Sequence, residues 1–163
     1  MTIIRKGTKA DLPRALELII ELATFERAPE QVINTVRKME EDGFGQNPVF
    51  GFFVAENKNG IVGLALYYWR YSTWKGKRIW LEDIIVTDSE RGKGIGKLLF
   101  DRMLSFCVEE NSEGMMWQVL DWNEPAIQFY KKYGAAVGTQ WLNCTLEREQ
   151  IEQLVSEEKS GKV

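Results

Sequence analysis

Three apolar runs follow one another between residues 50 and 86 with only short polar turns between them. Residues 50–56, 61–71 and 79–86 have the β-branched and aromatic content of strands. The turn Asn57-Lys58-Asn59-Gly60 is typical of a hairpin, so the first two strands should pair antiparallel. This block excludes a regular alternation of strand and helix and predicts a sheet that is largely antiparallel.

Helices and further strands are expected on both sides of this block. Because they are mixed in order, the sequence predicts an α/β class with a mixed sheet in a single domain over residues 1–163. The expected elements are a strand at 2–5, helices from about 11 to 26 and from 35 to 42, a helix at 95–111, a strand at 115–120, a helix at 125–133, a strand at 140–146 and a charged terminal helix from about 147.

Composition narrows the chemistry that this fold can carry. The chain has no histidine, which excludes a Ser-His-Asp triad, a Cys-His pair and a His-ligated zinc. Cys107 and Cys144 lie outside any CxxC pattern, so we expect a reduced, cytoplasmic protein without a metal. A net charge of −3 and the absence of a long apolar stretch argue against nucleic acid and membranes as partners.

A glycine-rich segment, Arg91-Gly92-Lys93-Gly94-Ile95-Gly96-Lys97, lies between a predicted strand and a predicted helix. Free backbone N–H groups and the helix dipole favour an anion such as phosphate at such a position. The dinucleotide fingerprint GxGxxG fails because Lys97 stands where its last glycine is needed, and the P-loop pattern is absent. A glycine-rich turn without a ligand is the alternative interpretation.

Two consecutive carboxylates, Glu82 and Asp83, interrupt an otherwise apolar strand. Because neighbouring strand residues point to opposite sides, at least one of them should face a covered side or a cleft. Such a group can hold a cationic substrate or act as a base, whereas capping of nearby backbone or pairing with Arg or Lys is the structural alternative. Their place directly before the glycine-rich segment favours a functional role.

Asn123 and Pro125 open the helix expected after the strand at 115–120. Asn123 is suited to cap that helix and Pro125 to its first turn. Tyr130 lies on the same helix, where a tyrosine is more often a packing residue than a catalyst. The residues alone therefore indicate only structural roles here.

Several segments, taken in order, resemble the GNAT N-acetyltransferase superfamily. They are Leu81-Glu82-Asp83-Ile84-Ile85-Val86, the segment from Arg91 to Gly96, Trp122-Asn123-Glu124-Pro125 and Phe129-Tyr130-Lys131-Lys132-Tyr133-Gly134-Ala135. Further segments are similar to the diamine (spermidine/spermine) and thialysine acetyltransferases, namely Glu21-Leu22-Ala23, Asp42-Gly43-Phe44-Gly45 and Tyr71-Ser72-Thr73-Trp74-Lys75-Gly76. The resemblance covers roughly residues 3 to 146.

This resemblance implies a GNAT fold, with a mixed, mostly antiparallel central sheet that is splayed at the acetyl-CoA site. It also implies direct attack of a neutral amine on acetyl-CoA in a ternary complex, and a homodimer with composite substrate sites. Tyr130 matches the family's general acid, which protonates the departing CoA thiolate. The positions that match the acetyl-CoA site are Ile84, Ile85 and Val86 for the pantetheine arm, the segment from Arg91 to Lys97 for the pyrophosphate, and Asn123, Glu124, Pro125 and Ala126.

The amine acceptor needs a proton acceptor, because amines of this kind have pKa values of about 10. Glu82 is the candidate base. Carboxylates at the matched positions would also attract a cationic substrate. The residues that the resemblance implies for the amine site are Phe25, Glu26, Trp74, Glu82, Asp83, Met116, Trp117 and Gln118.

Departures from the polyamine branch bear on the choice of substrate. Ser72-Thr73 stands where that branch has an acidic residue followed by proline, and Arg27-Ala28-Pro29-Glu30 replaces an acidic segment. Fewer carboxylates weaken polycation recognition, and the loop after Gly134 is shorter than in either branch. We therefore expect a lysine-like amino acid of the thialysine type as acceptor. Spermidine or spermine is the alternative within the class, and a non-catalytic acyl-CoA-binding module is the alternative outside it.

Overall fold

The computed structural model describes residues 1–159, which form two compact units, Met1–Gln118 and a second unit that starts at Val119. Short 3-10 turns at Lys9–Asp11, Pro29–Gln31 and Asp88–Glu90 join the longer elements. The elements of the first unit are β1 (Ile3–Lys6), α1 (Leu12–Phe25), α2 (Val36–Phe44), β2 (Gly51–Asn57), β3 (Gly60–Ser72), β4 (Gly76–Val86), α3 (Ile95–Glu109) and β5 (Met115–Met116). The second unit holds α4 (Glu124–Lys131) and α5 (Arg148–Lys159).

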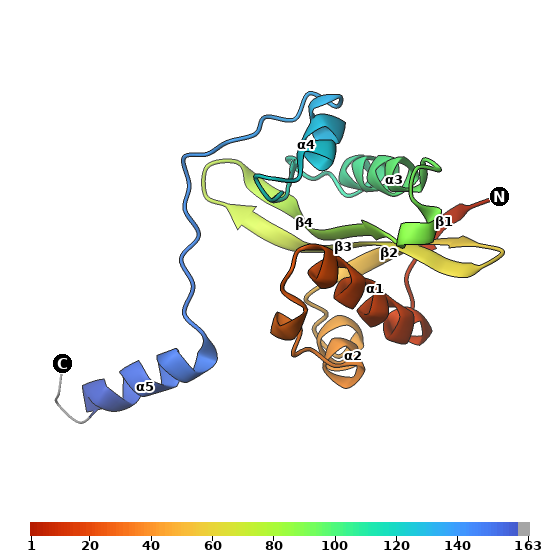
Figure 1. The fold of residues 1–163 in the computed structure, drawn as a ribbon. Coiled ribbons are helices and arrows are strands. Elements are labelled where there is room, and N and C mark those ends of the chain that lie inside the picture. Colours follow the sequence, from red (N-terminus) through yellow and green to blue (C-terminus); the bar gives the residue numbers. More distant parts are fainter. Residues whose placement is uncertain (160–163) are drawn as a thin grey trace. The chain divides into compact units, whose positions relative to one another are not determined.

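The first unit is built on a five-stranded sheet in the order β1-β2-β3-β4-β5. The first four strands pair antiparallel, and β5 runs parallel to β4. Figure 1 shows α1 and α2 on one face of this sheet and α3 on the other. The mixed, mostly antiparallel sheet flanked by helices confirms the predicted fold class. No described helix is long and apolar enough to cross a membrane.

Both faces of the sheet carry a core, which explains why the central strands show continuous apolar runs. On the face of α1 and α2, the buried cluster comprises Leu12, Ala15, Leu18, Met39, Phe52, Val54, Leu64, Leu66 and Ile85. On the face of α3, the rings of Phe53 and Tyr67 stack at 5.8 Å, and both pack on Phe106. Leu64 and Leu66 thus mark the α1 face of β3, and Tyr67 marks the α3 face.

The predicted strand at residues 140–146 is wrong. Residues 135–147 contain no helix or strand, and Trp141 and Leu142 are 87% and 88% exposed. Apolar content suggested a buried strand, but a strand also needs a partner for its peptide groups, and no other strand occurs in the described residues 119–159. The strand expected at 115–120 is likewise reduced to Met115–Met116.

Candidate active site

A β-bulge in β4 places Glu82. Leu81 pairs with Tyr67 and Asp83 pairs with Leu66, so Glu82 is the extra residue between two consecutive partners. The bulge interrupts the alternation of the pleat: Asp83 pairs with Leu66 on the α1 face, and Glu82 accepts a 2.7 Å hydrogen bond at Oε2 from Nε1 of Trp80. The expectation that Glu82 and Asp83 point to opposite faces is therefore wrong, and both carboxylates lie on one face.

Glu26 completes a group of three carboxylates on this face. It directly follows α1, which packs against β4. Burial, together with the negative charges of Glu82 and Glu26, raises the pKa of Asp83 to about 7. Burial also raises the pKa of Glu26. Asp83 can therefore exchange a proton near neutral pH, and the group favours a cation.

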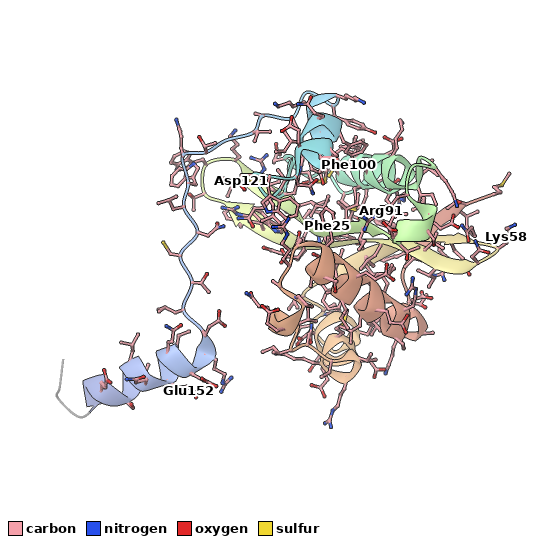
Figure 2. The ribbon with its side chains drawn as sticks, in the orientation of Figure 1. Phe25, Lys58, Arg91, Phe100, Asp121 and Glu152 are labelled. Carbon is pink, nitrogen blue, oxygen red and sulfur yellow. The ribbon has the colours of Figure 1, made fainter. Side chains whose placement is uncertain are left out.

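Phe25 and Arg91 connect this acidic group to the glycine-rich segment. The Arg91 guanidinium lies over the Phe25 ring, 5.3 Å from its centroid (Figure 2). Nε of Arg91 also donates to the carbonyl of Val86 at 2.9 Å, and Nη1 pairs with Asp88 at 3.2 Å. Arg91 thus holds the segment against the end of β4.

The glycine-rich segment exposes backbone rather than side-chain charge. Gly92 and Gly94 have φ values of 73° and 79°, and a Cβ at either would meet no atom within 4 Å. Gly94 caps α3 without a side chain, so the amides of its first turn gain no capping acceptor. Lys93 pairs with Glu90 at 3.1 Å, and Lys97 pairs with Asp101. An anion here would be held chiefly by amides and the helix dipole.

The edge of β4 that faces β5 is open beyond Trp80. Within residues 1–118, β5 pairs with β4 only through Ile79 and Trp80. The amide of Thr87 donates to the carbonyl of Val62 at 2.9 Å, on the β3 side. Because consecutive residues of an antiparallel ladder alternate between its two edges, Ile85 faces β3, whereas Ile84 and Val86 face the open edge. Ile84 and Val86, two of the three residues expected to bind the pantetheine arm, therefore direct their peptide groups to this edge, where the Val86 carbonyl already accepts from Arg91.

In the second unit, Asn123 and Tyr130 lie on one helix. Oδ1 of Asn123 accepts from the amide of Ala126 at 3.3 Å, and Pro125 lies in the first turn of α4, as the sequence predicts. Glu124 accepts from Gln128 one turn later. Tyr130 is 6% exposed, and burial raises its pKa to about 12. The phenol thus keeps its proton at neutral pH and can donate it.

The remaining predicted substrate residues lie in different surroundings. Met116 is within 3.9 Å of Arg70, whereas Trp117 packs edge-on against Phe100 of α3 at 5.4 Å. Gln118 ends the first unit. Trp74, at the tip of the β3–β4 hairpin, is 86% exposed. The first unit therefore brings Glu26, Glu82 and Asp83 together, whereas Trp74 is exposed at the hairpin tip and Trp117 packs against α3.

Sequence reasoning missed the residues that surround Glu82. Trp80 holds its carboxylate, and the pKa of Tyr68 is raised by burial and by the charge of Glu82. The period-two spacing of Trp80 and Glu82 was a usable signal, whereas the pairing of Tyr68 with Trp80 depends on register. Within the described residues, no group of three or more His, Cys, Asp or Glu side chains is arranged to hold a metal ion.

Several known proteins are similar to this chain along much of its length. The acetyltransferase (GNAT) family matches residues 14–135. Thialysine N-epsilon-acetyltransferase of Mus musculus is 36% identical over 164 residues, covering 94% of this chain and 96% of that protein. Spermidine/spermine N(1)-acetyltransferase-like protein 1 of Homo sapiens is 34% identical over 139 residues, which are 81% of this chain and 20% of that protein.

A solved structure shares the fold at lower identity. An aminoglycoside acetyltransferase from an uncultured soil metagenomic sample, meta-AAC0020, aligns with a TM-score of 0.75 and 22% identity, covering 90% of this chain and 97% of that one. GNAT acetyltransferases use acetyl-CoA, a co-substrate that agrees with the open β4 edge and the glycine-rich segment. The chain belongs to the GNAT acetyltransferase family and is an N-acetyltransferase.

Proposed function

We propose that this enzyme transfers the acetyl group of acetyl-CoA to a primary amine of a small, lysine-like amino acid. The observation that carries the proposal is the group of Glu26, Glu82 and Asp83 on one face, beside the open edge of β4. The clustered carboxylates attract a cationic amine by their negative charge, and the same groups can accept its protons. The similarity to a protein named thialysine N-epsilon-acetyltransferase supports this class of acceptor.

The first unit fits acetyl-CoA at two places. The amides at the start of α3, next to Gly92 and Gly94, suit the pyrophosphate, because no Cβ blocks close approach. The open edge at Ile84 and Val86 suits an extended arm with amide groups of its own, since such an edge pairs with added backbone-like chains. We assign Asn123, Glu124, Pro125 and Ala126, at the start of α4, to acetyl-CoA binding as well. When bound, acetyl-CoA supplies a thioester carbon that an amine can attack.

Proton transfer is assigned to three side chains. The incoming ammonium loses a first proton to solvent through Asp83, whose pKa of about 7 suits exchange. Glu82 accepts the second proton as the amine nitrogen forms the new N–C bond, and it then releases this proton to solvent. Tyr130 gives its phenolic proton to the sulfur as the C–S bond breaks, and it regains a proton from solvent. The products are an amide and a free thiol, with one proton released overall.

A polyamine such as spermidine is the second candidate acceptor. The carboxylates of Glu26, Glu82 and Asp83 suit any cationic amine, and one relative is named a spermidine/spermine N(1)-acetyltransferase-like protein. Release of CoA thiol from acetyl-CoA, measured with thialysine, lysine, ornithine, putrescine, spermidine and spermine, separates the two. Highest kcat/KM with an amino acid supports the main proposal, and highest kcat/KM with spermidine supports the second. No thiol release with any amine would refute both.

The proposal includes a cytoplasmic homodimer. Cys107 and Cys144 are both free thiols, which agrees with a reducing compartment. In the second unit, Trp141, Leu142 and Leu146 are exposed, and Ile151, Leu154 and Val155 form a partly exposed stripe on α5. Exposed apolar side chains on one segment favour a protein partner, and a second copy would cover them. Light scattering after size exclusion tests this: twice the chain mass of 18.8 kDa supports the dimer, and a monomer refutes it.

A further inference from the structure

Two arginines of the β3–β4 hairpin lie directly opposite each other on the α1 face. Arg70 on β3 pairs with Arg78 on β4, two positions beyond the pair of Tyr68 and Trp80. Side chains two apart on a strand share a face, so Arg70 lies on the same face as Leu66. Like charges that face each other across a strand pair destabilise it. The arrangement therefore calls for an anion between or beside them.

Within residues 1–118 no carboxylate supplies that anion. Neither arginine forms an ion pair there, and Nε of Arg78 is buried without a hydrogen-bond acceptor. The Arg78 guanidinium packs over Gly114, where an added Cβ would lie 2.6 Å from Nη2. A buried donor without a partner is costly, and native proteins rarely retain one unless a ligand or water satisfies it.

The Arg70 guanidinium extends over β4 toward the acidic group. It lies over the Trp80 ring, 5.2 Å from its centroid, and Nη1 is 3.9 Å from Sδ of Met116 on β5. The same indole donates its N–H to Glu82. Tyr68, beside this ring, responds to both charges, because Glu82 raises its pKa and Arg70 lowers it. One tryptophan thus separates a positive end of the site from a negative end.

We propose that Arg70 and Arg78 bind the α-carboxylate of an amino acid acceptor whose side-chain amine lies at Glu82 and Asp83. This inference rests on the proposed function and defines its substrate class. Guanidinium groups match a carboxylate with paired, charge-assisted hydrogen bonds. A polyamine has no anionic group and would bring a positive charge toward both arginines. The pair therefore selects amino acids and excludes polyamines.

The test compares acceptors that differ only in the carboxylate. Lysine and cadaverine form one such pair, and ornithine and putrescine form another. For the wild type, kcat/KM should favour the amino acid of each pair by about tenfold or more. Arg70→Met should raise the KM for lysine about ten- to hundredfold with little change in kcat, while the KM for cadaverine stays equal or falls. Arg70→Lys should restore part of the loss.

Lys77→Met is the matched control, because Lys77 lies on the same hairpin but over the Trp69 ring, at 3.6 Å, on the opposite face. It should leave both KM values unchanged. Binding of Nε-acetyllysine and N-acetylcadaverine, measured by calorimetry, gives a readout without turnover: Arg70→Met should weaken only the former. Arg78→Met should have the same effect as Arg70→Met, and where it fails to fold the Arg70 variants decide.

The outcomes separate this inference from the proposed function. An Arg70→Met variant that changes lysine and cadaverine kinetics equally, or changes neither, overturns the carboxylate site. A wild type that prefers cadaverine or putrescine to the matched amino acid also overturns it but leaves acetyl transfer to amines intact. A wild type that acetylates no amine refutes the proposed function itself.

Discussion

Nε1 of Trp80 donates a 2.7 Å hydrogen bond to Oε2 of Glu82, two residues further along β4. Such a bond between near neighbours on one strand requires that both side chains lie on the same face. The bulge at Glu82 then brings Asp83 to that face as well, because Asp83 pairs with Leu66. One local irregularity thereby places both proposed proton acceptors on one face.

Replacing Trp80 by phenylalanine tests whether this bond orients Glu82. Trp80→Phe keeps an aromatic ring on β4 but removes the indole N–H that donates to Oε2 of Glu82. Because a charge-assisted hydrogen bond is lost, we expect kcat/KM to fall about tenfold with the fold unchanged. Steady-state kinetics measure this, with Trp69→Phe on the opposite face of β3 as control. Equal effects of the two variants would refute an orienting role.

Replacing Glu82 by glutamine tests its role as base. Glu82→Gln keeps the size of the side chain but removes the proton acceptor, so kcat should fall about a hundredfold. The dependence of kcat/KM on pH should also change, since one ionisation is lost. A pH profile and kcat equal to those of the wild type would move the role to Asp83.

Asp83→Asn should stabilise the protein in a pH-dependent manner. The folded state holds the pKa of Asp83 at about 7, above the unfolded value of about 4. The folded state therefore binds more protons between these values, and wild-type stability falls as the pH rises through them. Asparagine does not ionise, so the variant avoids this loss of unfolding free energy, which is no more than about 4 kcal/mol in the wild type. The Tm of the variant should exceed that of the wild type at pH 8 and match it below pH 4.

Local sequence signals predicted much of the first unit and the start of α4 in the second. The hairpin at Asn57-Lys58-Asn59-Gly60 and the helix start at Asn123 each depend on residues close in the chain, and both form as expected. The glycine-rich segment also lies between a strand and a helix, as predicted. This place in the chain follows from the residues on either side of the segment and does not depend on contacts with distant residues.

Features that depend on register were not predictable. The bulge at Glu82 arises from how β4 aligns with β3, and a single sequence does not fix that alignment. The pairing of Arg70 with Arg78 has the same origin. The prediction of a strand at 140–146 was wrong for a related reason. Apolar residues such as Trp141 suggest burial, but they do not reveal whether another strand is present to pair with the segment.

Gly94→Ala tests the proposed pyrophosphate site. Gly94 has a φ of 79°, so a side chain there strains the backbone by about 1 kcal/mol. Gly60 has a φ of 91° in the β2–β3 turn, and a Cβ at either position meets open space. Both alanine variants should lose similar stability, but only Gly94→Ala should weaken binding of CoA, as measured by calorimetry. Equal CoA affinity in the two variants would argue against the site.

Tyr130→Phe tests the general acid. The phenol is buried, and its pKa of about 12 keeps the proton in place at neutral pH until a thiolate forms. Phenylalanine keeps the ring and removes only the hydroxyl, so kcat should fall about a hundredfold while the affinity for acetyl-CoA stays the same. Tyr133→Phe, on the turn after α4, is the control and should retain wild-type kcat. Because the acid acts on the leaving thiolate, a thioester with a more acidic thiol should recover part of the rate in Tyr130→Phe. Unchanged turnover, or no recovery with the better leaving group, would assign protonation of the thiolate to another donor.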